Sequence, residues 1–371
     1  MILGVIPSLG ESIEILTRVG VAPRFINAYL GRYSREFEKT YYFTNSNEEP
    51  GFPPRVFAVP KKTPVHYTLY ALLLPFIQRE RVKECDCFRV MQLIGAVPAV
   101  IIKLIYRKPY VATYGFKYTE YAKKDYSFWV ASATALIEYF GLRLADAIIV
   151  TTQELKKYVG KSISEQKIHL IPNGVDTKLF RPSSQRENIK KKDVILFIGR
   201  LSKEKNLFSL IEGVSLLPSK VPLLFIGDGS LKEELIKFAK EKSVNLQIET
   251  RVANDELPRY INEAEVFILP SLTEGHPKVL LEAMSCGIPC IGTNVPGIRD
   301  LIQDGVTGIL CSDTTSESVA RGIERLMREK NLAETIGVNA RKFIQEHYEL
   351  NRLLDQEINL LKSVAGKYRV K

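Results

Sequence analysis

The chain has 371 residues, of which 45% are hydrophobic and 25% charged, so it is too long for one ordinary hydrophobic core and rich enough in apolar residues to build two. Its five cysteines form no CxxC pair and have no histidine at metal-ligand spacing, which argues against a disulfide framework or a zinc site. The formal net charge of +10 lies mainly in the first half, because residues 1–180 hold 24 Lys and Arg against 16 Asp and Glu, whereas residues 181–371 hold 28 against 26.

The basic first half admits three interpretations. It can be an ordinary solvated surface, or it can face an anionic lipid surface or an anionic acceptor. Nucleic acid is the weakest partner, because no basic run is interleaved with stacking aromatic residues. Residues 1–7 read as a strand and not as a signal peptide, and no apolar run reaches the roughly 20 residues of a membrane-spanning helix. We therefore expect a cytoplasmic protein that lies, at most, on the inner face of the cell membrane.

Short β-branched and aromatic runs alternate with longer helical patterns along the chain, which predicts an α/β fold with parallel sheets. In the first half the predicted strands are residues 2–7, 40–44, 55–59, 87–92, 110–114, 147–152 and 168–172. In the second half they are residues 193–199, 222–228, 246–250, 266–271, 289–293 and 307–311. Two such series predict two Rossmann-like domains.

A polar stretch, residues 181–193, separates the two series of strands and predicts a boundary loop. We assign residues 1–172 to an N-terminal, acceptor-side domain and residues 173–350 to a C-terminal, nucleotide-binding domain. Residues 351–371 predict an amphipathic helix that can pack on either domain, including back on the N-terminal one.

Two cations follow the predicted strand 193–199. The strand ends in Gly199, and Arg200 and Lys205 come directly after it. Ligands of open α/β sheets bind at the carboxyl ends of strands, so these side chains stand where a diphosphate would be bound. A solvated charged loop is the alternative. Gly227 and Asp228 likewise come directly at the end of the next strand, 222–228, where they could lie close to a ligand. A tight strand-to-helix turn would favour the same residues.

The stretch SLTEGHPKVLLEAMSCGIPC, residues 271–290, predicts a short helix over residues 278–286. Pro277 has the fixed φ that suits a first helical turn, and Gly287 has the freedom that suits a helix end. The free N–H groups at the start of such a helix bind anions.

Two glutamates in this stretch are not where a merely structural sequence most needs a carboxylate. Glu274 lies in the turn before the helix, where it would compete with an anion unless it contacts a neutral group rich in hydroxyls, such as a sugar ring. Glu282 lies in the apolar run, where it is costly to bury alone and can accept hydrogen bonds from a ribose. The structural alternatives are a helix-dipole carboxylate at Glu274 and an ion pair between Glu282 and Lys278.

Four motifs occur in order along the chain: LIPNGVDTKLFRP, FIGRLSKEKN, FIGDGSLKEEL and ELPRYINEAEVFILPSLTEGHPKVLLEAMSCGIPCIGTNVPGIRDLI. As a set they resemble the retaining GT-B glycosyltransferases of family 4. The resemblance covers residues 144–350. It implies two Rossmann-like domains that face each other across a cleft, with the nucleotide-sugar held by the C-terminal domain.

The resemblance also implies roles for the matching residues. Arg200 and Lys205 would contact the donor diphosphate, and Glu274 would hold hydroxyls of the donor sugar, which makes these three the catalytic candidates. Glu282 would hold the ribose. The other donor-binding candidates are Gly227, Asp228, Arg251, Val252, Gly275, His276, Pro277, Lys278 and Val279.

The N-terminal half departs from the family pattern. The family often has two glycines after the first strand, where this chain has only Gly10, and commonly a histidine near the end of the strand at residues 108–116, where this chain has Tyr114. We take Gly10, Tyr114 and the hinge residue Asn173 as acceptor-side candidates, although Tyr114 suits packing on the core. His276 stands where phenylalanine is more usual, and we interpret it as a packing residue and not as a base.

The reaction that the resemblance implies is transfer of a hexosyl unit from a nucleoside diphosphate sugar, such as a UDP- or GDP-hexose, to a hydroxyl of a glycan or lipid-linked acceptor, with retention of configuration. Arg200, Lys205 and the helix N-terminus would stabilise the leaving diphosphate, so no metal and no other cofactor is expected. Two alternatives are a non-catalytic sugar-nucleotide-binding partner subunit and a sugar-nucleotide epimerase of the same fold.

Residues 68–83 and 96–110 combine apolar faces with basic ends, which suits peripheral contact with an anionic membrane. Helices of a Rossmann-like domain that end in solvated Lys and Arg would look the same.

Overall fold

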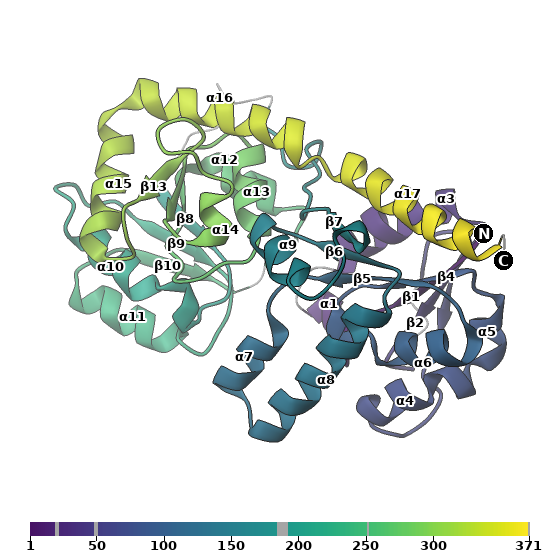
Figure 1. Cartoon of the computed structure of the whole chain (residues 1–371). Helices are drawn as coiled ribbons and strands as arrows, with labels where there is room; N and C mark the ends of the chain where they lie inside the picture. Colours follow the sequence, from purple (N-terminus) through teal and green to yellow (C-terminus); the bar gives the residue numbers. More distant parts are fainter. Residues whose placement is uncertain (19–21, 48–50, 184–191, 251, 370–371) are drawn as a thin grey trace. The chain divides into compact units, whose positions relative to one another are not determined.

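The computed structural model (Figure 1) describes residues 1–18, 22–47, 51–183, 192–250 and 252–369. The chain forms two compact units. Unit 1 comprises residues 1–172 together with residues 353–371, and unit 2 comprises residues 173–352. No helix in the described ranges is long and apolar enough to cross a bilayer.

Unit 1 is built on a seven-stranded sheet in the order β3-β2-β1-β4-β5-β6-β7, in which all paired strands run parallel. Its strands are β1 (Ile2–Ile6), β2 (Lys39–Phe43), β3 (Val56–Val59), β4 (Cys87–Val90), β5 (Tyr110–Tyr114), β6 (Ala147–Val150) and β7 (Ile168–Leu170). The strands predicted for this half are confirmed, with ends that differ by at most two residues.

Helices cover both faces of this sheet because successive side chains along each strand point to opposite sides. Leu3 and Tyr42 pack with α1, α3 and α17, whereas Tyr41 and Phe43 pack with α4, α6 and α9. The helices of unit 1 are α1 (Ile13–Arg18), α2 (Ala22–Arg24), the π-helix η1 (Phe25–Leu30), α3 (Gly31–Glu36), α4 (Tyr67–Ile77), α5 (Arg79–Glu84), η2 (Leu93–Gly95), α6 (Val97–Tyr106), α7 (Tyr118–Asp125), α8 (Phe128–Leu144), α9 (Gln153–Gly160), η3 (Glu165–Lys167) and α17 (Leu350–Arg369).

The last helix, α17, is held in unit 1 by a buried ion pair. The Arg89 guanidinium in β4 donates two hydrogen bonds of 2.9 Å to the Glu357 carboxylate of α17, and a third of 2.7 Å to Thr113. The exposed fractions of Arg89 and Glu357 are 3% and 4%. The Tyr33 hydroxyl of α3 donates to the same carboxylate. Figure 1 shows α17 lying along α3.

Unit 2 is built on a six-stranded parallel sheet in the order β10-β9-β8-β11-β12-β13. Its strands are β8 (Lys192–Ile198), β9 (Leu223–Ile226), β10 (Leu246–Glu249), β11 (Ala264–Leu269), β12 (Cys290–Thr293) and β13 (Ile309–Cys311). Its helices are η4 (Lys203–Lys205), α10 (Leu207–Ser215), α11 (Lys232–Glu241), α12 (Leu257–Glu263), α13 (Lys278–Ser285), α14 (Pro296–Arg299), α15 (Ser316–Arg328) and α16 (Lys330–His347). The strands predicted for this half are confirmed as well, and the fold is α/β with two Rossmann-like sheets.

The chain enters unit 2 at residue 173, before the polar stretch at residues 181–193 begins. Val175 and Phe180 already lie in the core of unit 2. The Phe180 carbonyl accepts a hydrogen bond of 2.6 Å from the Ser285 hydroxyl. Two buried apolar side chains therefore tie this segment to unit 2 before the sequence becomes polar, and residues 184–191 of the polar stretch lie outside the described ranges.

We predict that Glu357→Ala lowers the free energy of unfolding by about 3–5 kcal/mol, because it leaves the Arg89 charge buried without its partner. Urea unfolding of the full chain measures the loss. The matched control is Lys362→Ala on the same helix, which removes an exposed 2.8 Å pair with Glu36 and should cost no more than about 1 kcal/mol. Equal losses in the two variants would contradict this role of Glu357.

Candidate functional site

The strand order of unit 2 reverses between β8 and β11, which is the position where open α/β sheets bind their ligands. The loops that follow these two strands meet there. The Leu272 N–H in the β11 loop donates a hydrogen bond of 2.8 Å to the Glu204 carbonyl in the β8 loop. Residues that are far apart in the sequence are thus joined at the carboxyl edge of the sheet.

The same two loops are joined by an ion pair between two candidate residues. The Lys205 ammonium lies 2.5 Å from Oε1 of Glu274, and the Ser271 hydroxyl donates to the same oxygen at 2.7 Å. Both charged side chains are mostly buried. When the two side chains separate, a lysine in this position can bind a phosphate. The carboxylate can then bind a ring rich in hydroxyls. Arg200, in the same loop, is exposed.

Helix α13 begins directly after the Glu274 turn. It runs over Lys278–Ser285, with Pro277 as the residue before the helix and Gly287 after it at φ +69°. The predicted helix is therefore confirmed. Its first N–H groups have no carbonyl of their own turn to bond, so they are donors for an anion. Glu282, on the second turn of the helix, is 2% exposed.

The turn that carries Glu274 is fixed by neighbours that the sequence did not single out. The Thr293 hydroxyl donates to the Ser271 carbonyl at 2.5 Å. Gly297 of α14 lies so close that a Cβ there would come within 2.1 Å of the Gly275 carbonyl oxygen. Contact this close needs glycine, because a backbone oxygen cannot move aside as a side chain can.

Asn173 also belongs to this turn. Its side-chain amide donates a hydrogen bond of 3.0 Å to the His276 carbonyl. We expected Asn173 on the acceptor side, whereas the structure places it in unit 2 as a support for the donor-side turn. Its amide suits this task because a side-chain amide N–H can donate to a main-chain carbonyl.

His276 is buried, and its ring packs against Tyr348. Its ring centroid lies 5.3 Å from that of Tyr348, and its Nδ1 has no hydrogen-bond partner. Burial, with a smaller contribution from the Lys278 charge, lowers the pKa of His276 to about 4. The imidazole is therefore neutral at physiological pH. The interpretation of His276 as a packing residue agrees with this environment.

Gly227 and Asp228 support the β8 loop. A Cβ on Gly227 would lie 1.9 Å from the Gly199 carbonyl oxygen, and the Asp228 carbonyl accepts a hydrogen bond of 2.9 Å from the Leu201 N–H. The Asp228 side chain is exposed and accepts from the Gly229 N–H. It does not cap α11, whose first turn has no side-chain cap.

The remaining donor-side candidates lie around these loops. Pro277 is buried, Val279 is half-buried, and Gly275 and Lys278 are exposed. Val252 is half-buried against the core of unit 2. Arg251 lies outside the described residues.

Of the two acceptor-side candidates in unit 1, Tyr114 needs a correction. Tyr114 is fully buried, and its hydroxyl donates to the Glu138 carboxylate at 2.9 Å while its ring stacks on Tyr158. Its hydroxyl is thus used inside unit 1, because the ring at this strand end packs among neighbouring side chains and is not exposed. Gly10 has φ +77°, so its backbone conformation favours glycine.

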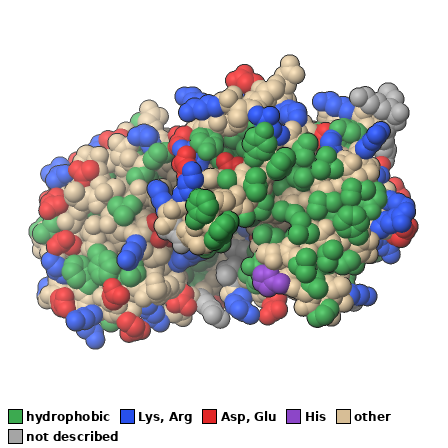
Figure 2. All heavy atoms as spheres, turned by 60° about the horizontal axis from the view of Figure 1, so that its bottom comes forward, with side chains coloured by type: hydrophobic (Ala, Val, Ile, Leu, Met, Phe, Trp, Pro, Cys, Tyr) green, Lys and Arg blue, Asp and Glu red, His purple; other side chains and the backbone are tan. Residues whose placement is uncertain are grey.

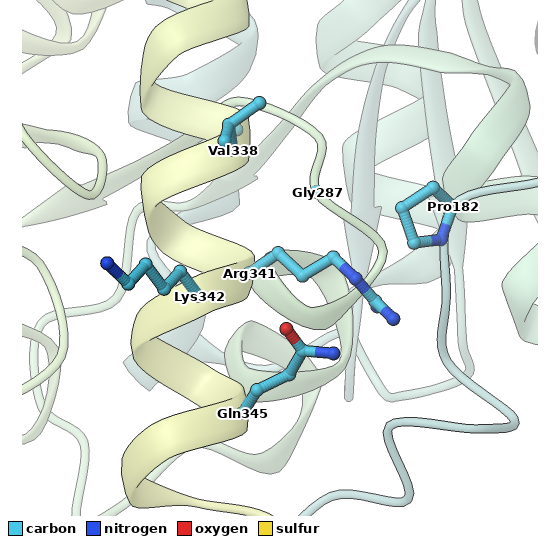
Figure 3. Close-up of a pocket in the computed structure, with 7 residues that line it drawn as sticks. Pro182, Gly287, Val338, Arg341, Lys342 and Gln345 are labelled. Carbon is cyan, nitrogen blue, oxygen red and sulfur yellow. The ribbon is translucent and has the colours of Figure 1, made fainter.

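A separate hollow of about 210 Å³ lies in unit 2 beside α16 (Figure 3). Gly287, at the carboxyl end of α13, lines it, whereas the Glu274 turn lies at the amino end of that helix. In Figure 3, Arg341 points from α16 toward Pro182. Its guanidinium donates to the carbonyls of Phe180 and Ser285, so it holds backbone together. The hollow is therefore not part of the candidate site.

Two family models match the chain. The model "Glycosyl transferases group 1" matches residues 180–343, and the model "Glycosyltransferase Family 4" matches residues 18–179. Together they span both units.

Curated relatives match a large part of the chain. It is 28% identical to UDP-Gal:alpha-D-GlcNAc-diphosphoundecaprenol alpha-1,3-galactosyltransferase of Escherichia coli, over 59% of this chain and 61% of the relative. It is 29% identical to the capsular polysaccharide biosynthesis glycosyltransferase CapM of Staphylococcus aureus, over 62% of this chain and 66% of the relative. The chain spans about three fifths of the length of the curated relatives it matches.

Solved structures share the fold over nearly the whole chain. Sucrose-phosphate synthase from Thermosynechococcus elongatus has a TM-score of 0.79 at 18% identity and covers 99% of each chain. HepE of Anabaena, crystallised with UDP and glucose, has a TM-score of 0.73 at 19% identity and covers 98% of this chain and 99% of its own.

We predict that Gly297→Ala destabilises the protein by about 1–3 kcal/mol, because the new methyl group would overlap the backbone of residues 274 and 275. Thermal unfolding measures the effect. Gly366→Ala in α17 is the matched control, since a Cβ there meets nothing within 4 Å and alanine favours a helix. A Gly297→Ala protein as stable as the control would show that the turn is not held this tightly.

We predict that His276→Phe makes the protein less sensitive to acid. The pKa of His276 is lowered on folding, so the unfolded state binds the extra proton and the native state loses about 1.4 kcal/mol for each pH unit as the pH falls from about 6.5 to about 4. Unfolding free energies measured across this range should fall less steeply in the variant. His347→Gln, at an exposed site, should keep the wild-type slope, and an unchanged slope in His276→Phe would contradict the prediction.

Proposed function

Because the chain belongs to the group 1 glycosyltransferases of GT-B fold, we propose that it transfers a hexosyl unit from a nucleoside diphosphate sugar to an acceptor hydroxyl. The observation that carries this proposal is the contact between Lys205 and Glu274 at the strand-order reversal of unit 2. It pairs a group that binds phosphate with a group that binds sugar hydroxyls at one point of the sheet.

Donor binding would replace this internal ion pair by two new contacts. The ammonium of Lys205 would turn to the diphosphate, which Arg200 and the first N–H groups of α13 would also contact. The Glu274 carboxylate would accept hydrogen bonds from hydroxyls of the sugar. Neither charge is then left buried alone, which would cost several kcal/mol. Glu282, buried on α13, would accept hydrogen bonds from the ribose.

We propose that transfer proceeds with retention, as the resemblance to retaining glycosyltransferases implies. The bond between the sugar C1 and the diphosphate oxygen breaks while a bond from C1 to the acceptor oxygen forms on the same face of the ring. The acceptor hydroxyl gives its proton to the departing phosphate oxygen, so no protein base is required. Lys205, Arg200 and the α13 N-terminus would stabilise the negative charge that develops on the leaving diphosphate. With these groups in place, no divalent metal would be needed.

The names of the curated relatives support the acceptor class. The Escherichia coli relative is named for transfer from UDP-galactose to a diphosphoundecaprenol-linked sugar, and the Staphylococcus aureus relative for capsular polysaccharide synthesis. These names support an acceptor among the glycans and lipid-linked glycans of surface polysaccharide synthesis.

A screen of UDP-, GDP- and ADP-hexoses, with lipid extract as acceptor and with or without a metal chelator, tests the function. We expect a glycoside product whose anomeric configuration matches the donor, at a rate that the chelator leaves unchanged. Donor binding without turnover would indicate a non-catalytic partner subunit. Conversion of the donor into a new sugar nucleotide, without any glycoside, would indicate an epimerase.

With the donor that turns over, we predict that Lys205→Ala and Glu282→Ala each lower kcat/KM by about 100-fold or more, because each removes a charged contact to the donor. The matched control is Lys203→Ala, which changes an exposed lysine in the same loop and should keep close to the wild-type rate. If either variant transferred sugar as fast as the control, the assignment of the site would be wrong.

A further inference from the structure

Exposed hydrophobic side chains are concentrated in one part of unit 1. Of the 24 large hydrophobic residues exposed in the described ranges, 16 lie between residues 67 and 140. Figure 2, in which the lower side of Figure 1 faces forward, shows hydrophobic side chains gathered over the helices of this region. Exposed apolar side chains scattered singly need no explanation, but such a concentration marks a surface that binds something.

The helix α8 is the centre of this surface. Its first turn carries Phe128 and Trp129, whose exposed fractions are 76% and 79%. Leu136 and Phe140 follow on later turns and are exposed too. No Lys, Arg, Asp or Glu occurs from Tyr126 to Ile137. A surface helix of a soluble domain normally carries charged residues on its outer face, so α8 is apolar where water alone would favour polar side chains.

The exposed apolar surface continues onto the neighbouring helices. Helix α6 packs against both α4 and α8, so the three helices lie side by side. Their exposed side chains include Leu72 and Phe76 on α4 and Leu104 and Ile105 on α6. We call the surface formed by these four residues with Phe128, Trp129 and Leu136 the apolar face.

Basic side chains border the apolar face. Exposed lysines and arginines lie next to the ends of its helices, and they are Arg79, Arg81, Lys83, Arg107, Lys123, Lys124 and Arg143. The exposed acidic residues of the same helices are fewer, and two of them have cationic neighbours of their own. Glu84 accepts a hydrogen bond from Arg81, and Glu120 lies 3.8 Å from the Lys117 ammonium. The border is therefore positively charged overall.

We propose that the apolar face docks on an anionic lipid bilayer, with Phe128 and Trp129 inserted at the level of the headgroups. Aromatic side chains favour the membrane–water interface, where an apolar body and a polar edge are both solvated. Lysine and arginine at the rim add attraction to anionic headgroups. The helices lie in the interface and do not cross it, which fits amphipathic elements of this length.

The sequence predicted membrane contact through residues 68–83 and 96–110, and the structure adds α8 as the most exposed element. Docking uses no residue of the donor site, because the apolar face lies in unit 1 and the donor candidates lie in unit 2. Loss of transfer activity and loss of docking are therefore separable results.

The chain contains a single tryptophan, Trp129, so its fluorescence reports on the apolar face directly. We expect the emission of the full chain to shift to shorter wavelength with phosphatidylglycerol vesicles, and brominated acyl chains to quench it. Phosphatidylcholine vesicles should give a much weaker response. No shift with either vesicle would overturn the proposal. A shift that rises with protein concentration in the absence of lipid, together with a dimer mass in light scattering, would overturn it in favour of a second copy of the chain.

Variants that retain Trp129 sharpen the test. Phe128→Ser should weaken partitioning onto anionic vesicles about 10-fold or more, since it removes a phenyl ring that would be buried in the membrane interface. Lys123→Gln with Lys124→Gln should weaken it roughly 25-fold, about 5-fold for each charge. Val338→Ser, which changes an exposed apolar residue of unit 2, should have no effect. If the Phe128→Ser protein and the Lys123→Gln, Lys124→Gln protein both bound vesicles as well as the wild type and the Val338→Ser control, the apolar face would not be the docking surface.

Discussion

The candidate site depends on the pairing of β8 with β11 in a parallel sheet. Because the two strands run in the same direction, their following loops leave from the same edge, although Lys205 and Glu274 are 69 residues apart in the sequence. The main-chain bond from Leu272 to Glu204 and the ion pair between Lys205 and Glu274 both follow from this pairing. The strand order also reverses here, so neighbouring helices do not cover the point where the loops meet.

The internal ion pair also limits which ligands the site can bind. Separating Lys205 from Glu274 is favourable only when each charge gains a new partner, because both side chains are mostly buried. An isolated phosphate would satisfy the lysine and leave the carboxylate with the Ser271 hydroxyl but without a cation, and a free sugar would leave the lysine without an anion. A nucleoside diphosphate sugar carries both groups in one molecule. The fixed turn around Gly275, held by Gly297 and Asn173, keeps the carboxylate at the start of α13.

The sequence predicted the strands well because each buried parallel strand is a short apolar run between polar or glycine-rich residues. Pro277 and Gly287 likewise marked both ends of α13. The ion pairs Arg89–Glu357 and Lys205–Glu274 could not be predicted, since they join residues 268 and 69 positions apart and depend on the packed fold. An arginine inside the apolar strand 87–92 was the available signal for the first pair. The exposed face of α8 was not predicted, because the sequence pattern of an apolar helix is the same whether its residues are buried or exposed.

Hydrogen–deuterium exchange on the full chain, with and without the nucleoside diphosphate sugar that is turned over, tests the location of the donor site most directly. The account predicts slower exchange at two places when the donor binds: the first amides of α13, residues 278–280, and the β8 loop, residues 199–206. These amides gain hydrogen bonds or lose contact with water. Unchanged exchange in both segments, with protection instead around the hollow beside α16 or only in unit 1, would contradict it.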